Sequence, residues 1–176
     1  LLAVELVERG QVAAEAVIKS QLKASPPAPG GATSVALAYA RLLFDLQRPK
    51  DAQVLLDNLT RIQPDAMEPW LLLATLQVQD KRLPAATRSL QTYMALARQS
   101  TDERASRGLT QAYLLMAQIA EQQKDFAAAT AWLLKAATQD EPVAQYRLGL
   151  CLLEGRGIAA DEVLALGDDP VHAQVD

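Results

Sequence analysis

The sequence predicts an all-α fold, a solenoid of antiparallel helix pairs, on two observations. The first is composition: half of the 176 residues are apolar but only 5% are aromatic, and alanine and leucine, both strong helix formers, dominate the remainder. The second is an internal repeat, because one set of apolar residues recurs along the chain at a regular spacing. Repeats of this length are typical of solenoids, in which one helical unit stacks on the next.

The repeat is clearest between residues 68 and 90. Five positions mark its unit: Trp70, Leu73, Ala74, Ala86 and Leu90. The same positions 34 residues upstream hold Ala36, Tyr39, Ala40, Ala52 and Leu56, and 43 residues downstream they hold Tyr113, Met116, Ala117, Ala129 and Leu133. A short polar break lies inside each unit, at 46–51, 78–84 and 121–126, with apolar residues recurring on both sides of it. Each unit is therefore predicted to be a helix, a tight turn and a second helix.

Helix packing explains why small residues recur. Two helices approach to about 8–10 Å only where a small side chain lets a ridge of one enter a groove of the other. The sequence offers such residues in the first helices and in the second helices: Ala40, Ala74 and Ala117, then Ala52, Ala86 and Ala129. Larger neighbours such as Leu56 and Leu90 are expected to fill the layer beside them.

The residues W-L-L-L-A at 70–74 and A-T-R-S-L at 86–90 resemble the tetratricopeptide repeat, whose pattern is W-x2-L-G-x2-Y, then A-x3-F, then P. Alanine replaces the glycine of that pattern, and leucine replaces the phenylalanine. Pro64 closes one unit as the pattern requires. The other departures are Ala36 for Trp, Leu43, Gln77 and Ala120 for Tyr, and Arg98 for the next Pro. The resemblance implies a right-handed superhelix that binds other proteins.

The tetratricopeptide array is expected to span residues 1–142. Its parts are a partial unit at 1–26 and three units at about 34–64, 68–98 and 108–141. The Pro- and Gly-rich stretch 25–33 predicts a longer loop. The nine-residue insertion at 98–106 contains neither Gly nor Pro, so it is predicted to extend one or both flanking helices.

A last unit at 143–166 is degenerate or resembles the Sel1-like variant of the repeat, with L-G-x2-L at 148–152 and G-R-G at 155–157. The glycines are predicted to serve a turn, since no strand precedes them and a phosphate-binding fingerprint is absent. Residues 167–176 are expected to form a frayed tail. Because the chain opens on LLAVELVERG rather than on Met, we interpret it as a fragment of a longer protein or a mature form.

Few residues could support catalysis. His172 is the only histidine and lies in the tail, which argues against His-based acid–base chemistry and multi-His metal sites. The adjacent Asp168 and Asp169 suit a solvated turn better than a carboxylate dyad. Cys151, the only cysteine, lies among leucines and is predicted to be a buried, inert thiol. We therefore expect a protein that is not an enzyme and has no cofactor or metal.

Charge excludes two further classes of partner. The net charge is −4, and Lys and Arg are scattered, so neither a nucleic-acid footprint nor a polybasic membrane patch is indicated. No uncharged run suits a membrane span. Asp51, Asp80 and Asp125 lie at the breaks, where they are expected to cap or precede the second helices.

The remaining candidate site is a surface. In such arrays the first helices line a concave face that binds extended peptides or partner helices. The repeat register places eleven residues there: Leu37, Arg41, Asp45, Leu71, Thr75, Val78, Gln79, Leu114, Gln118, Glu121 and Gln122. Three equivalent leucines on a solvated face are unusual, although they could instead contact the adjacent unit.

Some relatives hold the C-terminal carboxylate of chaperones with a clamp of Lys, Asn and Arg in these helices. The matching positions here are Leu37, Arg41, Leu71, Thr75, Leu114 and Gln118. Only Arg41 could contribute to such a clamp. The groove should therefore favour an amphipathic or mixed apolar ligand over an acidic tail.

The sequence thus predicts a non-catalytic scaffold for a protein or peptide ligand. Its composition, rich in Ala, Gln, Arg and Leu, and its repeat sequence are similar to those of bacterial repeat proteins that serve envelope assembly, secretion or pilus biogenesis. Either the cytoplasm or the periplasm would suit such a chain. One alternative is a structural module that self-associates through its terminal helices, since residues 1–7 are apolar. Another is an accessory segment of a larger enzyme.

Overall fold

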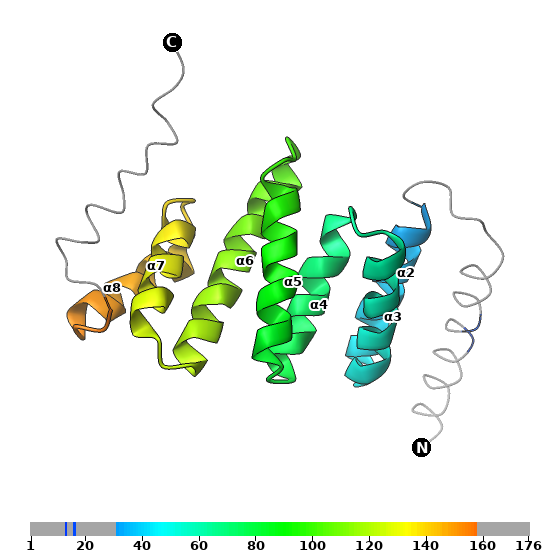
Figure 1. The fold of residues 1–176 in the computed structure, drawn as a ribbon, viewed down its shortest axis with the longest axis horizontal. Coiled ribbons are helices and arrows are strands. Elements are labelled where there is room, and N and C mark those ends of the chain that lie inside the picture. Colours follow the sequence, from blue (N-terminus) through cyan, green and yellow to red (C-terminus); the bar gives the residue numbers. More distant parts are fainter. Residues whose placement is uncertain (1–12, 14–15, 17–30, 158–176) are drawn as a thin grey trace, which may run out of the picture. The chain divides into compact units, whose positions relative to one another are not determined.

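The computed structural model describes residues 31–157, together with residues 13 and 16. Helices occupy most of 31–157, and no strand occurs there (Figure 1). They are α2 (Gly31–Asp45), α3 (Pro49–Ile62), α4 (Met67–Gln79), α5 (Leu83–Ala97), α6 (Glu103–Gln122), α7 (Phe126–Ala137) and α8 (Pro142–Leu153). The predicted all-α class and its succession of helices and tight turns are confirmed. The right-handed superhelix stays a prediction.

Several predictions fall outside the described residues. They concern nearly all of the partial unit at 1–26, the apolar residues 1–7, Asp168, Asp169 and His172 in the tail, and the end of the unit at 143–166. The predicted loop at 25–33 lies mostly outside them too, and its last residues are helical, since α2 begins at Gly31.

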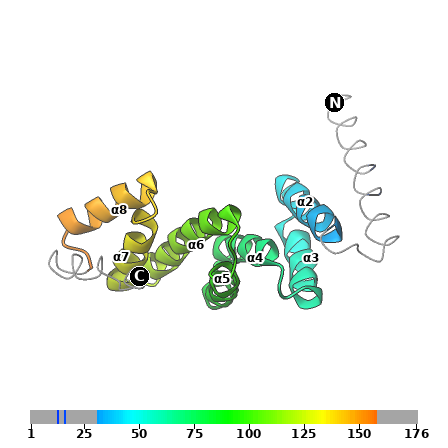
Figure 2. The same cartoon turned by 90° about the horizontal axis from the view of Figure 1, so that it is seen from above.

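The chain divides into two compact units, Leu1–Leu76 and Gln77–Asp176, called unit 1 and unit 2 below. In unit 1, α2 and α3 lie side by side (Figures 1 and 2). The core of unit 1 contains ten buried residues from α2, α3 and α4 (Met67–Gln79): Ala36, Leu37, Tyr39, Ala40, Leu43, Ala52, Leu56, Leu59, Leu73 and Leu76. The indole of Trp70 packs against this core and donates from Nε1 to the carbonyl oxygen of Pro64 at 2.9 Å.

In unit 2, α5 packs on α6, α6 on α7, and α7 on α8. A core cluster of Ala117, Leu133 and Leu148 joins the last three helices, and half-buried residues surround it: Leu114, Trp132, Leu134, Ala137 and Cys151. The rings of Tyr113 and Trp132 stack with their centroids 5.8 Å apart, which fastens α6 to α7. The prediction that Cys151 is buried is only partly right, because its side chain is half-buried.

The recurring small residues are packing residues, as predicted. The alanines of the first helices, Ala40, Ala74 and Ala117, have at most 1% of their surface exposed, and so do Ala52, Ala86 and Ala129 in the second helices. The leucine four residues after each second-helix alanine is fully buried: Leu56, Leu90 and Leu133. A larger side chain at any of these alanines would overpack the contact, at about 1–3 kcal/mol.

The turns inside the helix pairs share one backbone conformation. Gln47, Lys81 and Lys124 have φ values of 58°, 56° and 60°, in the left-handed region that favours glycine. After each of them, the next amide reaches back to a carbonyl oxygen of the last helical turn: Arg48 to Leu43, Arg82 to Gln77 and Asp125 to Ala120, at 2.8–2.9 Å. This is the Schellman arrangement, which ends a helix and reverses the chain.

The end of α8 has the same turn, this time with glycine. Gly155 has a φ of 63°, and the amide of Arg156 donates to the carbonyl oxygen of Cys151 at 2.9 Å. Gly157 comes two residues later with a φ of 100°. The prediction that these glycines serve a turn is therefore confirmed.

The insertion at 98–106 lengthens one helix only. Helix α5 ends at Ala97, whereas α6 begins at Glu103 and is 20 residues long, against 13–15 residues in the preceding helices. Asp102 starts α6 because its carboxylate accepts the amide hydrogen of Arg104 at 2.9 Å.

The three aspartates at the breaks differ in role. Asp125 caps α7, accepting from the amide of Ala128 at 3.0 Å, and Asp80 precedes α5, as predicted. The prediction is wrong for Asp51, which lies inside the first turn of α3. There its carboxylate pairs with Arg48 at 2.6 Å, and a negative charge in this turn complements the helix dipole.

Candidate protein-binding face

The predicted binding residues of unit 1 lie on α2 and α4. Arg41 and Asp45 of α2 are exposed. The prediction is wrong for Leu37, which belongs to the core of unit 1 with 4% of its surface exposed, because the apolar face of α2 is wide enough to include it. Leu71 and Thr75 of α4 are half-buried, and the Thr75 hydroxyl donates to the carbonyl oxygen of Leu71 at 2.9 Å.

The end of α4 contributes two predicted residues with opposite environments. Gln79 is exposed, whereas Val78 has only 3% of its surface exposed. Neither Val78 nor Leu37 therefore offers its side chain to a ligand. The repeat register places both residues on the predicted concave face. Their burial, however, depends on what packs against that side of each helix, and the register carries no information about that.

In unit 2 the predicted residues lie along α6. Gln118 and Gln122 are exposed, while Leu114 is half-buried and rests against the core cluster of Ala117, Leu133 and Leu148. Leu114 thus combines two roles that the sequence leaves open, since it contacts a neighbouring helix and still presents part of its surface.

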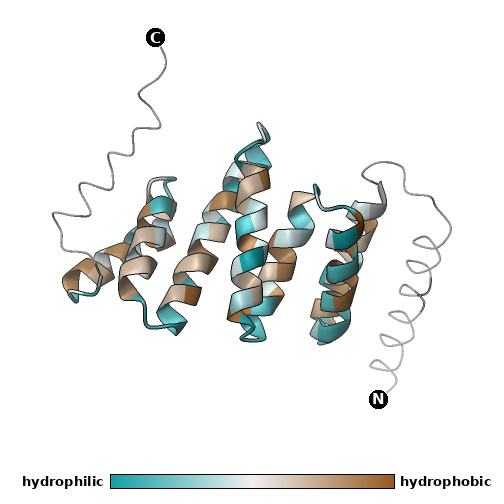
Figure 3. Cartoon of the chain, in the orientation of Figure 1, coloured by the Kyte–Doolittle hydropathy of each residue, from teal (hydrophilic) through white to brown (hydrophobic). Residues whose placement is uncertain are grey.

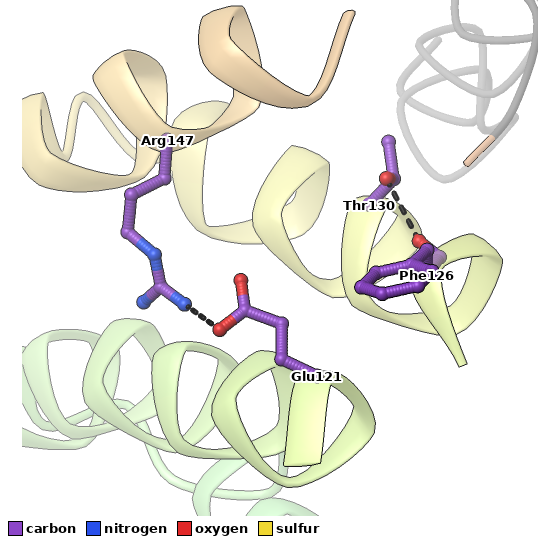
Figure 4. Close-up of polar contacts among 4 residues, drawn as sticks. All are labelled: Glu121, Phe126, Thr130 and Arg147. Atoms are coloured by element: carbon purple, nitrogen blue, oxygen red, sulfur yellow. Dashed lines mark hydrogen bonds and ion pairs between the residues drawn. The ribbon is translucent and has the colours of Figure 1, made fainter. Parts of the chain in front are cut away.

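Glu121 forms an ion pair across two first helices. Its Oε2 lies 2.7 Å from Nη2 of Arg147 on α8, and Figure 4 shows the guanidinium turned toward the carboxylate. The side chains are 36% and 28% exposed, so solvent screens the pair and it is worth up to about 1 kcal/mol. The pair also links α6 to α8, and each of its two charges neutralises the other on the surface that these helices share.

Arg147 is not identified by the sequence pattern. The feature that could have pointed to it is its isolation, since Arg147 is the only charged residue within Pro142–Leu153. A lone charge in a helix with so many apolar residues needs a partner or a path to solvent. Glu121 supplies the partner, but only the packing of α8 beside α6 and α7 brings the two together.

Within residues 31–157 we find no grouping of three or more His, Cys, Asp or Glu side chains that could hold a metal ion. The helices of this part of the chain are also too short or too polar to cross a membrane. Among the predicted binding residues of unit 2, the chemistry on offer is that of the exposed amides of Gln118 and Gln122, the ion pair of Glu121 with Arg147, and the half-buried Leu114.

A family model for the tetratricopeptide repeat matches residues 33–76. Residues 33–76 are therefore similar to a tetratricopeptide repeat. The matched segment covers most of α2, all of α3 and α4 up to Leu76. No curated protein and no solved structure matches the chain.

Tetratricopeptide repeats generally mediate protein–protein interactions and are typically not catalytic. The geometry of the turns and alanines, repeated at α4–α5 and α6–α7, follows that of the matched segment. The Sel1-like resemblance of 143–166 and the bacterial origin stay predictions.

Proposed function

We propose that the chain is a non-catalytic scaffold that binds a peptide or a partner helix along the exposed side of its first helices. The observation that carries the proposal is the division of α6 into two sides. Ala117 and Ala120 are buried in the core, whereas Gln118 and Gln122, one or two positions further on, are exposed. We define the binding face of unit 2 as Leu114, Gln118, Glu121, Gln122 and Arg147.

The chemistry of this face favours an amphipathic ligand. Its two glutamine amides donate and accept hydrogen bonds, Leu114 offers apolar surface, and the charge of Glu121 is matched by Arg147. A free acidic tail would find no unpaired cation among these residues. In unit 1 the first clamp position is also lost, because Leu37 is buried.

For the biological setting we propose a role in bacterial envelope assembly or secretion. The support is the resemblance of the repeat sequence to repeat proteins of those systems, so this part of the proposal is an analogy between families.

The test is capture of partners from a lysate of the source cells with three versions of the chain. Gln118→Arg places a long cation on the binding face of unit 2. Gln91→Arg makes the same change at an exposed position of the second helix α5 and serves as the matched control. Both positions are exposed, so both variants should keep the helicity of the wild type, which circular dichroism checks.

The expected result is a protein held by the wild type and by Gln91→Arg but lost, by about tenfold in affinity, by Gln118→Arg. A loss of this size corresponds to about 1.4 kcal/mol. Equal capture by all three versions would show that the face of α6 is not the binding site.

A further inference from the structure

Helix α8 carries a row of exposed apolar residues, called the α8 row below. They are Val143, Tyr146, Leu150 and Leu153, with 54%, 69%, 37% and 85% of their surface exposed. Their spacing of three, four and three residues places all four on one side of the helix, as in the apolar seam of a coiled coil. The other side of α8 is packed, since Ala144 is fully buried and Leu148 belongs to the core of unit 2. In Figure 3 most of α8 is coloured as hydrophobic.

The α8 row corresponds to the exposed side of α6. The sequence aligns Leu148 and Gly149 with Met116 and Ala117. Burial agrees with this alignment, because Ala144 and its equivalent Ala112 are both fully buried. The row then falls on four residues of α6 that are exposed or half-buried, although α7 packs on α6: Gln111, Leu114, Gln118 and Glu121. The second helix of that pair therefore leaves this side of the first helix open.

The two helices differ in the chemistry of this side. Three of the four positions in α6 hold an amide or a carboxylate, which water solvates well, whereas all four in α8 are apolar or aromatic. An exposed row of large apolar residues is unfavourable in water, and such patches mark interaction surfaces. Tyrosine is moreover enriched at protein interfaces, where its ring is buried and its hydroxyl can stay at the rim. The α8 row is therefore suited to contact with another apolar surface.

The spacing of the row makes it complementary to itself. The intervals of three, four and three are the same in both directions along the chain. Two copies of α8 lying antiparallel would therefore bring Val143 opposite Leu153, and Tyr146 opposite Leu150. A two-fold axis forms each of these contacts twice, since in such an interface residue i meets j and residue j meets i.

The charges at the two ends of α8 fit the same arrangement. Asp140 and Arg156, both exposed, lie eight residues on either side of Leu148, the midpoint of the row, so each faces the other across the axis. The other three charged residues of 140–156 come opposite two glycines and a proline: Glu141, Arg147 and Glu154. No like charges therefore meet, and one pair of opposite charges occurs at both ends of the contact.

We propose that the α8 row joins two copies of this chain, with their α8 helices antiparallel. A second copy accounts for both the symmetrical spacing and the match between the two ends of the helix, neither of which an unlike partner would require. The contact is confined to a helix of twelve residues, which is small for a stable interface, so we expect a weak dimer that forms as concentration rises. It involves the opposite end of the chain from the self-association predicted through residues 1–7.

Sedimentation of the full 176-residue chain over a range of concentrations tests the association. We expect the mass to double as concentration rises. Leu153→Asp, at the most exposed position of the row, should weaken association by about tenfold or more, because it places a carboxylate against an apolar residue of the second copy. Ile62→Asp, at an exposed apolar position of α3, is the matched control and should associate as the wild type does. Circular dichroism should show the same helicity in all three versions, since both positions are exposed.

Cysteine cross-linking tests the orientation, in a Cys151→Ser background that removes the native thiol. Val143→Cys and Leu153→Cys should form a disulfide with each other when the two variants are mixed and oxidised, and neither should form one alone. In the antiparallel arrangement, two copies of the same position lie about 15 Å apart along the helices, which is beyond the span of a disulfide. Neither experiment needs a ligand, so the results are independent of the proposed function.

Three results would overturn the proposal. A wild type that stays monomeric at all concentrations would assign the α8 row to an unlike partner or to none. A dimer that Leu153→Asp leaves intact would show that association uses another surface. A disulfide formed as readily by Val143→Cys alone as by the mixture would indicate that the helices are not antiparallel.

Discussion

The indole nitrogen of Trp70 on α4 lies 2.9 Å from the carbonyl oxygen of Pro64, in the connection that leaves α3. The bond ties the start of α4 to the end of the preceding helix pair. It gives the large residue of the repeat pattern a polar role besides its packing on the core of unit 1.

Trp70→Phe should remove this bond and keep most of the aromatic bulk. We expect the free energy of unfolding to fall by about 0.5–1 kcal/mol, since water can reach the freed carbonyl oxygen of Pro64. Urea denaturation monitored by circular dichroism measures it. Trp70→Ala, which also empties the packing site, should lose about 3 kcal/mol or more. Equal losses for the two variants would assign the whole effect to the hydrogen bond and contradict this division.

A buried polar pair in unit 2 gives a second prediction. The hydroxyl of Ser89 donates to Oε1 of Gln77 at 2.9 Å, and both residues are 4% exposed. Ser89→Ala leaves a buried acceptor without this donor, so we expect a loss of about 1–3 kcal/mol in urea denaturation. Adding Gln77→Leu removes the acceptor as well and should recover part of the loss. Ser106→Ala, at an exposed position of α6, is the control and should change stability by less than about 0.5 kcal/mol.

The left-handed turns predict that glycine stabilises the chain where it replaces lysine. Lys81 and Lys124 have φ values of 56° and 60°, a conformation that strains any residue with a Cβ atom. We expect Lys81→Gly and Lys124→Gly each to raise the free energy of unfolding by about 0.5–1 kcal/mol, after the entropy that glycine adds to the unfolded chain. The same change inside α7, Lys135→Gly, should instead lower it by about 1 kcal/mol. Losses at all three positions would argue against strain in the turns.

The two glycines after α8 should differ in their tolerance of alanine. A Cβ atom on Gly157 would collide with Oγ1 of Thr130 and lie 3.0 Å from the carbonyl oxygen of Phe126, whereas one on Gly155 would meet nothing within 4 Å. Gly155→Ala should therefore lose about 1 kcal/mol from its left-handed backbone alone. Gly157→Ala should lose clearly more, because the end of the turn must also move away from α7. Thermal melting of the two variants side by side makes the comparison, and equal melting temperatures would count against the contact with Thr130.

The sequence predicted the parts of the fold that depend on local pattern. The six alanines could be identified as packing residues because their spacing repeats, and the helix breaks because polar residues gather there. The left-handed turns could not be predicted in the same way, since Gln47, Lys81 and Lys124 are not glycines. Their conformation follows from the need to reverse the chain within three residues while the helices on either side keep their alanine contacts.

The candidate site was predicted less completely, for a physical reason. Position in a repeat tells which side of a helix a residue occupies, but burial depends on the neighbours of that side. Leu37 and Val78 are buried where the register had placed them on a surface. The pair of Glu121 and Arg147 joins residues 26 positions apart in sequence, and no local pattern links the two.

The alanine contacts affect the entropy of folding as well as the distance between helices. An alanine side chain has no rotamers to lose, whereas a buried leucine loses about 0.5–1 kcal/mol of rotamer freedom. At each alanine crossing, two backbones come close together without any side chain having to be ordered there. The conformational entropy lost at these crossings is therefore almost entirely that of the main chain. Mutations in the turns would then change the rate at which a helix pair forms mainly by changing the stiffness of the backbone, and less by changing the fit of side chains.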